Sequence, residues 1–420
     1  MPADPAFSCA TSNLCLPAVR GAALLMTEHT LDSLATTPRL AWRWWVLALI
    51  VGLAVLGAGL AEAQRWSAAR SALRAPVTGP LPPAAAVALT AVSNTLIPMP
   101  PGVPSAHASS LATTSGEGML AFWWAGSRES GPDVKVYASR WSGASWGVPY
   151  EVASRESLAA ALGFGVRRIG NPVAWTARDG TVNLFVVATG MGGWAASRVV
   201  HLVSADQGLR FTPRRILQMS PMFNTSALVR SAPLALPEGG WWLPVYFELG
   251  IKYPMIMAFD ELGDPRWLTR IGARTTTLQP TIVALSDSHA HAWMRDASDE
   301  RRVQQATTSD GGVSWQDLPP LDLPNYSTSL AALRLSGGGF LLLHNHVVPG
   351  GSDRNMLRLS ASSDARNWTP VLDVARGAPG REFSYPTLQQ VGEELHVTYT
   401  SHRTAIAHHV YRIGYGKNPP

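Results

Sequence analysis

A short turn element recurs along this chain and constrains its fold more than any other feature. Residues 308–315 follow the pattern Ser/Thr-x-Asp-x-Gly-x-Ser/Thr-Trp. Residues 204–211 share its first five positions and end on phenylalanine, residues 362–368 are the same element one residue shorter, and weaker copies end at Trp146 and Trp267. In such a hairpin turn, Asp and Ser or Thr cap backbone N–H groups, Gly adopts a positive φ, and the aromatic ring packs under the turn. The element is therefore structural.

The spacing of these turns predicts a β-propeller. Their aromatic ends, in chain order, are Trp146, Phe211, Trp267, Trp315 and Trp368. Successive ends lie 65, 56, 48 and 53 residues apart, which is about the length of one four-stranded propeller blade. About 310 residues carry the pattern, enough for six blades.

Short apolar runs between turn residues support the same class. They are residues 119–126, 181–190, 241–247, 339–346 and 395–401. The sequence of this region has no long amphipathic helix pattern, and the chain combines 37 Gly, 32 Pro and 16 Trp with only 15% charged residues. This composition favours many short strands and turns. We therefore predict an all-β, six-bladed β-propeller domain over residues 105–415.

Charge and cysteine placement exclude several function classes. The chain has 34 Lys and Arg against 29 Asp and Glu, but six arginines and four acids precede residue 100, so residues 100–420 carry only +3. That charge is too small and too dispersed for a nucleic-acid partner. Both cysteines, Cys9 and Cys15, lie near the N-terminus. The predicted propeller therefore has no disulfide, no thiolate nucleophile and no cysteine metal site.

An apolar segment precedes the propeller. Residues 44–60 contain no charge and are long enough to cross most of a bilayer core. We expect residues 1–43 to be an N-terminal cytoplasmic segment, residues 44–63 an uncleaved transmembrane helix, and residues 64–104 a Pro/Ala-rich linker. The alternative is a signal peptide cleaved after Ala63, which would give a secreted form. Either way the propeller is expected outside the cytoplasm, in the periplasm or at the cell surface.

The turns resemble the Asp-boxes of the sialidase superfamily, and residues 105–413 resemble a bacterial BNR-repeat propeller of its predicted-neuraminidase subgroup. In sialidases, three arginines hold the substrate carboxylate, a tyrosine assisted by a glutamate is the nucleophile, and an aspartate protonates the leaving group. Guanidinium forks fit a planar carboxylate, and a neutral phenol avoids the repulsion that an anionic nucleophile would meet there.

The resemblance assigns roles to particular residues. Arg295 and Arg354 match the second and third arginines, Tyr385 in FSYPTL matches the nucleophile, and Asp133 matches the acid/base aspartate. The simpler, purely structural interpretation is that Arg295 and Arg354 form ion pairs with the neighbouring Asp296 and Asp353.

Two positions depart from the family pattern. His107 stands where the first arginine is expected, and Gln279 stands where the glutamate is expected. Without that glutamate, Tyr385 lacks the general base that would activate a phenol of ordinary pKa about 10. Glu382 and Glu248 are the carboxylates that could replace it.

Other residues are further candidates for binding or catalysis. Arg128, Arg230 and Arg403 are additional candidate contacts for an anionic substrate. His344 and His346 alternate along a strand and could join His107 in a metal site or an acid-base pair, but a place on the strand surface is the simpler interpretation. We predict no metal and no cofactor.

The leading hypothesis is an exported, membrane-tethered, exo-α-sialidase-like glycoside hydrolase that acts on an acidic saccharide. Its expected partners are that saccharide and, through the apolar segment, the bacterial membrane; we expect a monomer and no nucleic acid. The first alternative is a non-catalytic glycan-binding propeller that kept its anion pocket and lost its base. The second is a uronate polysaccharide lyase that uses His107 or Tyr385 as base.

Overall fold

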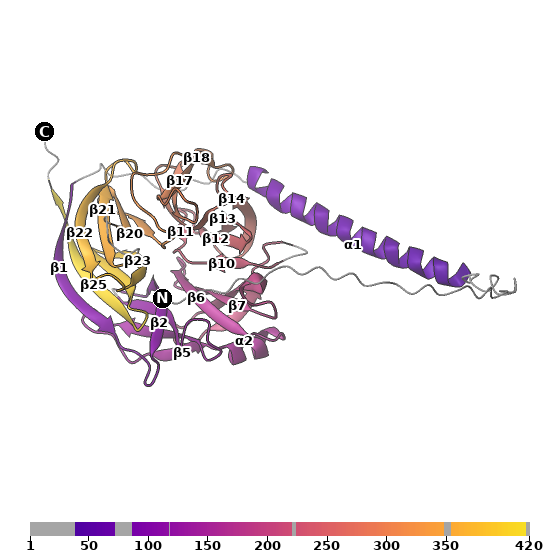
Figure 1. Cartoon of the computed structure of the whole chain (residues 1–420), viewed down its shortest axis with the longest axis horizontal. Coiled ribbons are helices and arrows are strands. Elements are labelled where there is room, and N and C mark those ends of the chain that lie inside the picture. The colour runs from indigo at the N-terminus through magenta and orange to yellow at the C-terminus, as the bar shows by residue number, and fades with distance from the viewer. Residues whose placement is uncertain (1–37, 72–85, 117, 221–223, 348–353, 417–420) are drawn as a thin grey trace, which may run out of the picture. The chain divides into compact units, whose positions relative to one another are not determined.

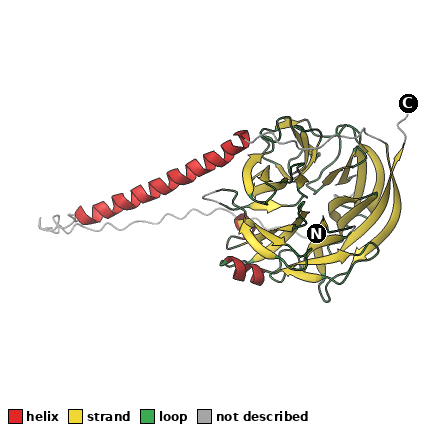
Figure 2. Cartoon of the chain, turned by 180° about the vertical axis from the view of Figure 1, so that it is seen from behind, coloured by secondary structure: helices red, strands yellow, loops and turns green. Residues whose placement is uncertain are grey.

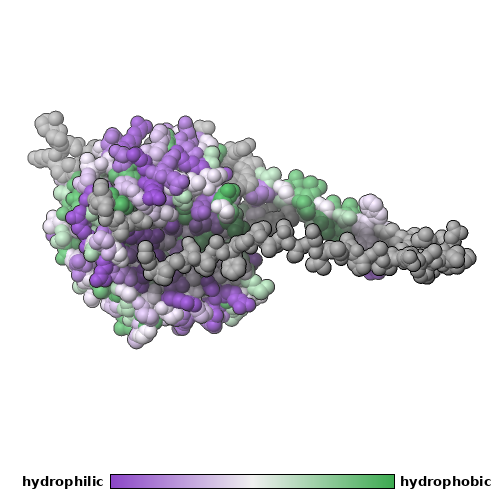
Figure 3. Space-filling view, in the orientation of Figure 1, coloured by the Kyte–Doolittle hydropathy of each residue, from purple (hydrophilic) through white to green (hydrophobic). Residues whose placement is uncertain are grey.

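The computed structural model describes residues 38–71, 86–116, 118–220, 224–347 and 354–416. The chain divides into two compact units, Met1–Leu56 and Gly57–Pro420. Helix α1 (Pro38–Ser71) begins in the first unit and ends in the second. Its stretch Trp42–Gln64, of mean hydropathy 2.2, is long and apolar enough to cross a membrane, and Figure 3 shows apolar side chains along this helix. The predicted apolar segment is therefore a single continuous helix.

Six antiparallel sheets radiate around a central axis and form the blades of a propeller (Figure 1). Blade 1 consists of β2 (Ser105–Thr113), β3 (Met119–Gly126), β4 (Lys135–Trp141) and β5 (Tyr150–Ala153). Blade 2 consists of β6 (Arg168–Thr176), β7 (Val182–Thr189), β8 (Ser197–Ser204) and β9 (Thr212–Ile216). Blade 3 consists of β10 (Ala227–Val229), β11 (Leu234–Ala235), β12 (Trp241–Leu249), β13 (Ile251–Phe259) and β14 (Pro265–Arg270).

The remaining three blades follow the chain in the same way. Blade 4 consists of β15 (Thr277–Ala284), β16 (Ala290–Asp296), β17 (Gln304–Thr308) and β18 (Gln316–Leu318). Blade 5 consists of β19 (Ala331–Arg334), β20 (Phe340–Asn345), β21 (Met356–Ser362) and β22 (Thr369–Arg376). Blade 6 consists of β23 (Phe383–Val391), β24 (Glu394–Ser401), β25 (Ala405–Gly416) and β1 (Ala86–Ile97). Besides strands, the described part of the propeller contains α2 (Arg155–Leu162) and the short η1 (Gly193–Ala196), so strands dominate it (Figure 2).

Blade 6 closes the ring with strands from both ends of the domain. Strand β1 pairs antiparallel with β25 from Ala86 opposite Gly416 to Ile97 opposite Ile406. Residues 64–104, expected to be a linker, therefore contain the outermost strand of this blade, and the propeller begins before residue 105. Apolar residues recur along β1 in its sequence AVALTAVSNTLI. The all-β, six-bladed prediction is confirmed.

The recurring turns have the capping geometry that their sequence predicts. In residues 308–315, Asp310 Oδ1 accepts hydrogen bonds from Thr308 Oγ1 at 2.8 Å and from the Ser314 N–H at 3.0 Å. The Gly312 N–H donates to Thr308 Oγ1 at 3.0 Å, and Gly312 has φ +88°. Trp315 packs against the buried Trp242 of the preceding blade. This turn thus also joins blade 4 to blade 3.

Replacing Gly312 by alanine is expected to destabilise the propeller much more than the same change at Gly143. Both glycines have a similar positive φ, +88° and +91°, which costs an alanine about 1 kcal/mol. A Cβ on Gly312 would lie 2.6 Å from the Trp242 ring, whereas a Cβ on Gly143 meets nothing within 4 Å. The clash adds about 1–3 kcal/mol. Urea unfolding of both variants measures this difference, and equal losses would show that the turn does not depend on this contact.

Candidate functional site

A cavity of about 390 Å³ lies at one end of the central axis, lined by residues of five blades. One part of its wall is apolar and aromatic, with Trp124, Ile169, Trp194 and Leu228. The other part carries the functional groups of Glu129, Asn171, Tyr246, Glu248, Gln279, Arg295 and Tyr385. A mixed wall of this kind is typical of sites that bind small polar ligands.

Bulges in four inner strands shape the floor of this cavity. Strands β2, β6, β15 and β23 each shift register at one point relative to the neighbouring strand. At these points Ala108, Asn171, Gln279 and Tyr385 have φ values of +58°, +37°, +51° and +54°. Such values are rare outside glycine and concentrate at functional sites. Three of the four bulges place a polar side chain on the cavity wall.

Tyr385, Gln279 and Arg295 meet at the cavity floor. Arg295 Nη1 lies 3.5 Å from the Tyr385 hydroxyl oxygen and donates a hydrogen bond to Gln279 Oε1 at 3.3 Å. The amide nitrogen of Gln279 lies 3.5 Å from the same Tyr385 oxygen and 3.3 Å from that of Tyr246. Arg295 Nε donates to Ser327 Oγ at 3.1 Å, which fixes the guanidinium. The structure therefore brings together three of the residues singled out in the sequence.

Arg354 and Arg403 share one carboxylate. Glu382 Oε1 accepts from Arg354 Nη1 at 2.9 Å, and its Oε2 accepts from Arg403 Nε at 2.7 Å. Burial would raise the pKa of Glu382, but hydrogen bonds from Arg403 and Ser384 and the charge of Arg354 lower it to about 2. Glu382 is therefore an anion that orients two arginines, and it is unsuited to act as the base for Tyr385.

Arg403 joins this cluster from a turn that connects two strands of blade 6. It lies in the turn between β24 and β25, and its carbonyl oxygen accepts hydrogen bonds from the Ala106 N–H and from Ser105 Oγ at the start of β2. Its Nη1 donates to Glu129, which lines the cavity. The backbone of Arg403 is thus fixed to the start of β2, while its guanidinium binds Glu382 and Glu129.

His107 and Arg230 are buried against Tyr385. The His107 ring lies 4.1 Å from the Tyr385 ring between centroids and 5.4 Å from the Trp124 ring. Burial, and next the charge of Arg403, hold the pKa of His107 well below its ordinary value, so the imidazole is neutral. Arg230 Cζ lies 5.0 Å from the Tyr385 ring centroid, and burial lowers its pKa to about 10. Both residues contact the tyrosine, although neither lines the cavity.

Asp133 and Arg128 lie in the loop after β3, but they do not line the cavity. Asp133 accepts hydrogen bonds from the Ser127 N–H at 2.7 Å and Ser127 Oγ at 2.8 Å, and these bonds lower its pKa. The carboxylate of this loop that does line the cavity is Glu129. Glu248, at the end of β12, lines it too and forms no ion pair in the described part of the chain. The acid/base role predicted for Asp133 is therefore not supported by its position.

His344 and His346 lie away from this cavity. His344 is buried within β20, with Nε2 3.3 Å from Ser360 Oγ, and the two imidazole centroids lie 6.0 Å apart. Among the described residues, no three His, Cys, Asp or Glu side chains are grouped as metal ligands.

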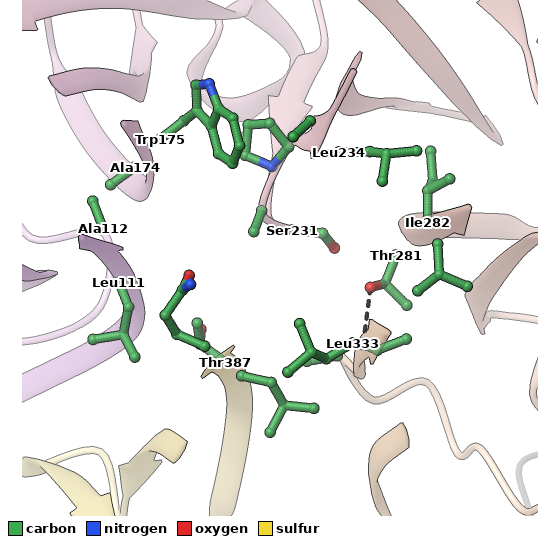
Figure 4. A pocket seen from close by; sticks show the side chains of 18 of the residues that line it. Leu111, Ala112, Ala174, Trp175, Ser231, Leu234, Thr281, Ile282, Leu333 and Thr387 are labelled. Carbon is green, nitrogen blue, oxygen red and sulfur yellow. Dashed lines mark hydrogen bonds between the residues drawn. The ribbon is translucent and has the colours of Figure 1, made fainter. Parts of the chain in front are cut away.

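A second cavity of about 330 Å³ lies further along the same inner strands (Figure 4). Its labelled wall is made of apolar groups and of the hydroxyls of Ser231, Thr281 and Thr387. Pro386 and Arg230 line this cavity, whereas Tyr385 lines the first one. Among the described residues, no carboxylate and no histidine lines this second cavity. The first cavity is therefore the better candidate for acid-base chemistry.

Sequence reasoning missed Asn171, Trp194 and Tyr246. A signal for Asn171 was present, because Asn171, Gln279 and Tyr385 each precede a proline and lie 108 and 106 residues apart. The three X-Pro pairs mark equivalent bulges in blades 2, 4 and 6. Trp194 donates from its indole nitrogen to Ser130 Oγ at 3.0 Å across two blades, a contact that no local pattern predicts.

Comparison with known proteins agrees with this architecture. Residues 117–397, more than half of the chain, match the model of the BNR repeat-like domain. The chain therefore belongs to the BNR repeat-like domain family, and its fold is that of a sialidase-like propeller. Comparison with curated proteins finds no match.

Solved structures show the same fold at low sequence identity. A protein of unknown function from Dyadobacter fermentans is 14% identical with a TM-score of 0.63, and the match covers 78% of this chain and 99% of that one. The Hadza microbial sialidase Hz136 is 16% identical with a TM-score of 0.61, covering 74% and 66%. The Trypanosoma rangeli sialidase in complex with sialic acid is 14% identical with a TM-score of 0.56, covering 79% and 60%. This chain thus spans less than two thirds of the length of either sialidase.

Proposed function

We propose that this chain binds an acidic saccharide in the cavity of about 390 Å³ and cleaves it as an exo-α-sialidase-like glycosidase. The observation that carries the proposal is the meeting of Tyr385, Arg295 and Gln279 at the cavity floor. A guanidinium beside a phenol oxygen suits a sugar whose carboxylate is attached to its anomeric carbon.

Arg295 is the principal carboxylate ligand in this proposal. Its hydrogen-bond partners are Ser327, Gln279 and Tyr385, none of which is a carboxylate. Arg354 and Arg403, by contrast, already share Glu382. A substrate carboxylate therefore gains most from Arg295, which forms no ion pair with a carboxylate in the described structure.

The reaction consists of two displacements at the anomeric carbon. The deprotonated oxygen of Tyr385 forms a bond to this carbon while the bond to the leaving oxygen breaks, and that leaving oxygen takes a proton from a carboxylic acid of the cavity. Water then attacks the same carbon, the tyrosine oxygen leaves, and the proton of the water returns to the carboxylate. Glu248 suits this role by position because it lines the cavity without an ion pair, whereas Glu129 is held by Arg403.

A non-catalytic glycan-binding propeller is the second candidate. Gln279 favours it, because an amide takes up no proton from Tyr385, and so does the neutral, buried His107. A screen of the full-length protein in detergent against fluorogenic sialosides and uronosides, with Tyr385→Phe as reference, tests both candidates. We expect turnover that Tyr385→Phe reduces by about 100-fold or more. Calorimetric binding without turnover selects the glycan-binding candidate. Absence of both binding and turnover would contradict both candidates.

We also propose that helix α1 tethers the propeller outside the cytoplasm. Support comes from its stretch of 23 residues that is long and apolar enough to cross a membrane, a property shared by a signal sequence. Protease treatment of intact cells or spheroplasts tests the location, and digestion of the propeller only after lysis would contradict it. Mass spectrometry of the mature N-terminus distinguishes the tethered form from a form cleaved after Ala63.

A further inference from the structure

The hydrogen-bond partners of the Tyr385 oxygen in the described structure are two donors. Arg295 donates to the Oε1 atom of Gln279, so the amide nitrogen of Gln279 turns toward the phenol oxygens of Tyr385 and Tyr246. Tyr385 therefore has Gln279 Nε2 and Arg295 Nη1 at 3.5 Å each, both of which are donors. In the described structure the Tyr385 hydroxyl donates no hydrogen bond of its own. Such surroundings favour the deprotonated oxygen over the protonated one.

Among the described residues, no carboxylate contacts the guanidinium groups of Arg230 and Arg295 beside Tyr385. Arg230 is 3% exposed, and its Nη1 and Nη2 donate to the carbonyl oxygens of Ser109 at 3.3 Å and Pro386 at 2.8 Å. Its guanidinium lies over the Tyr385 ring. A buried cation that contacts only neutral groups is costly unless an anion lies near. The phenol of Tyr385 is the ionisable acid in direct contact with both Arg230 and Arg295.

We propose that Tyr385 is held as a phenolate in the resting protein by Arg230 and Arg295, so that this tyrosine needs no carboxylate base. The use of the phenolate as a nucleophile rests on the proposed function, whereas its ionisation does not. Arg230 acts here as a positioning residue, because it fixes the bulge at Pro386 and supplies charge under the ring.

The other charged and titratable groups around Tyr385 are consistent with this state. Burial alone would raise the pKa of Tyr385, but the charge of Arg295, the amide of Gln279 and the charges of Arg354 and Arg230 together lower it. His107, packed on its ring, is neutral. Burial, and next the charges of Tyr385 and Glu248, raise the pKa of Tyr246, so one phenol of the pair ionises and the other stays protonated.

Gln279 has a defined part in this arrangement. A carboxylate at position 279 would place a negative charge beside the phenol oxygen and would oppose its ionisation. An amide adds no charge and keeps an N–H directed at the oxygen. The departure from the family's glutamate therefore exchanges a base that removes the proton for surroundings in which the proton is already absent.

Spectroscopic titration of the full-length protein in detergent tests the inference through the near-ultraviolet absorbance of tyrosinate. We expect the first step of the wild-type curve to lie below the ordinary tyrosine pKa of about 10 and to have the amplitude of one of the nine tyrosines. This step should be lost in Tyr385→Phe. Gln279→Glu should move this step upward by about one pH unit or more. Gln389→Glu is the matched control, because Gln389 lines the second cavity and should leave the step in place.

Two results would overturn the inference. One is a Tyr385→Phe curve that matches the wild type below about pH 9, and the other is a Gln279→Glu step at or below the wild-type position. Thermal melts show whether each variant is folded, and Gln279→Glu preserves the side-chain shape if Tyr385→Phe is unstable. Glycan binding without the low titration step would contradict this inference alone, whereas the step without glycan binding would contradict only the proposed function.

Discussion

Replacing Arg295 by alanine is expected to weaken the binding of an acidic saccharide by about 100-fold or more. Losing a charged hydrogen-bond partner of a buried carboxylate costs about 3 kcal/mol, and each 1.4 kcal/mol is a factor of ten. Arg354→Ala should have a smaller effect, because Glu382 already neutralises Arg354 and keeps Arg403 as a partner after the change. Calorimetry with a saccharide that ends in sialic acid or a uronate measures both losses.

Arg266→Ala is the matched control for this prediction. Arg266 is an exposed arginine that pairs with Asp260 on the surface, so its loss removes the same charge far from the cavity lining. Arg295→Lys separates charge from geometry, because lysine keeps the charge and loses the planar fork. Equal affinities for the wild type and Arg295→Ala would remove Arg295 from the site, and equal losses in Arg266→Ala would show that only overall charge matters.

The fold was predictable from the sequence because its signals are local. Each of these turns is closed by side-chain hydrogen bonds between groups two to four residues apart, as in the hydrogen bonds of Asp310 with Thr308 and Ser314. Such contacts leave a readable pattern, and the spacing of the patterns sets the number of blades. Strand β1 was missed because it is an edge strand whose partner lies more than 300 residues away, at the other end of the domain.

The site was predictable only in part, because its geometry depends on contacts between blades. The resemblance singled out Tyr385, Arg295 and Gln279, and the structure brings them together at the cavity. It could not distinguish Asp133 from Glu129, which lie four residues apart in one loop. Ser127 binds Asp133 within that loop and leaves Glu129 on the cavity wall.

The paired arginines illustrate the same limit. The simpler interpretation of the sequence was an ion pair between Arg295 and Asp296. In the structure, Asp296 instead accepts hydrogen bonds from the backbone N–H groups of Ser298 and Arg302. Asp353, the neighbour of Arg354, lies outside the described residues. Sequence proximity is a poor guide to ion pairs in a propeller, because adjacent residues of a strand point to opposite faces of its sheet.

The propeller is expected to unfold in mild acid, because it buries neutral histidines in three blades, His201 in blade 2, His344 in blade 5 and the hydrogen-bonded pair His396 and His408 in blade 6. Burial lowers the pKa of His201 and His408 to about 3 and of His344 and His396 to about 4. In the unfolded chain these imidazoles take up protons below their ordinary pKa of about 6.5. The unfolded state then binds more protons than the folded state, so the free energy of unfolding decreases as pH falls below about 6.5.

The expected loss is large. At about pH 5 each independently buried neutral histidine removes about 2 kcal/mol from the free energy of unfolding, so His201, His344 and the coupled pair His396 and His408 remove at least about 6 kcal/mol together. Natural domains have a net stability of about 5–15 kcal/mol, so this loss suffices to unfold many of them. The carboxylates add to it only at lower pH, because Asp364 and Glu382 have pKa values of about 2. Urea unfolding at a series of pH values between about 5 and 8 measures the dependence.

A pair of glutamine variants identifies which histidines are responsible. His201 is buried and has Nε2 2.8 Å from Asn183 Oδ1, whereas His289 is exposed. In His201→Gln, the number of protons taken up on unfolding should fall by up to one, even where the variant is less stable at neutral pH. In His289→Gln, the slope of the free energy of unfolding against pH should be unchanged. Stability that stays constant from about pH 8 to about pH 5 would contradict the prediction. Constant stability would require the folded protein to protonate these imidazoles as readily as the unfolded chain does. Their burial opposes this, because a buried charge without a carboxylate partner is costly.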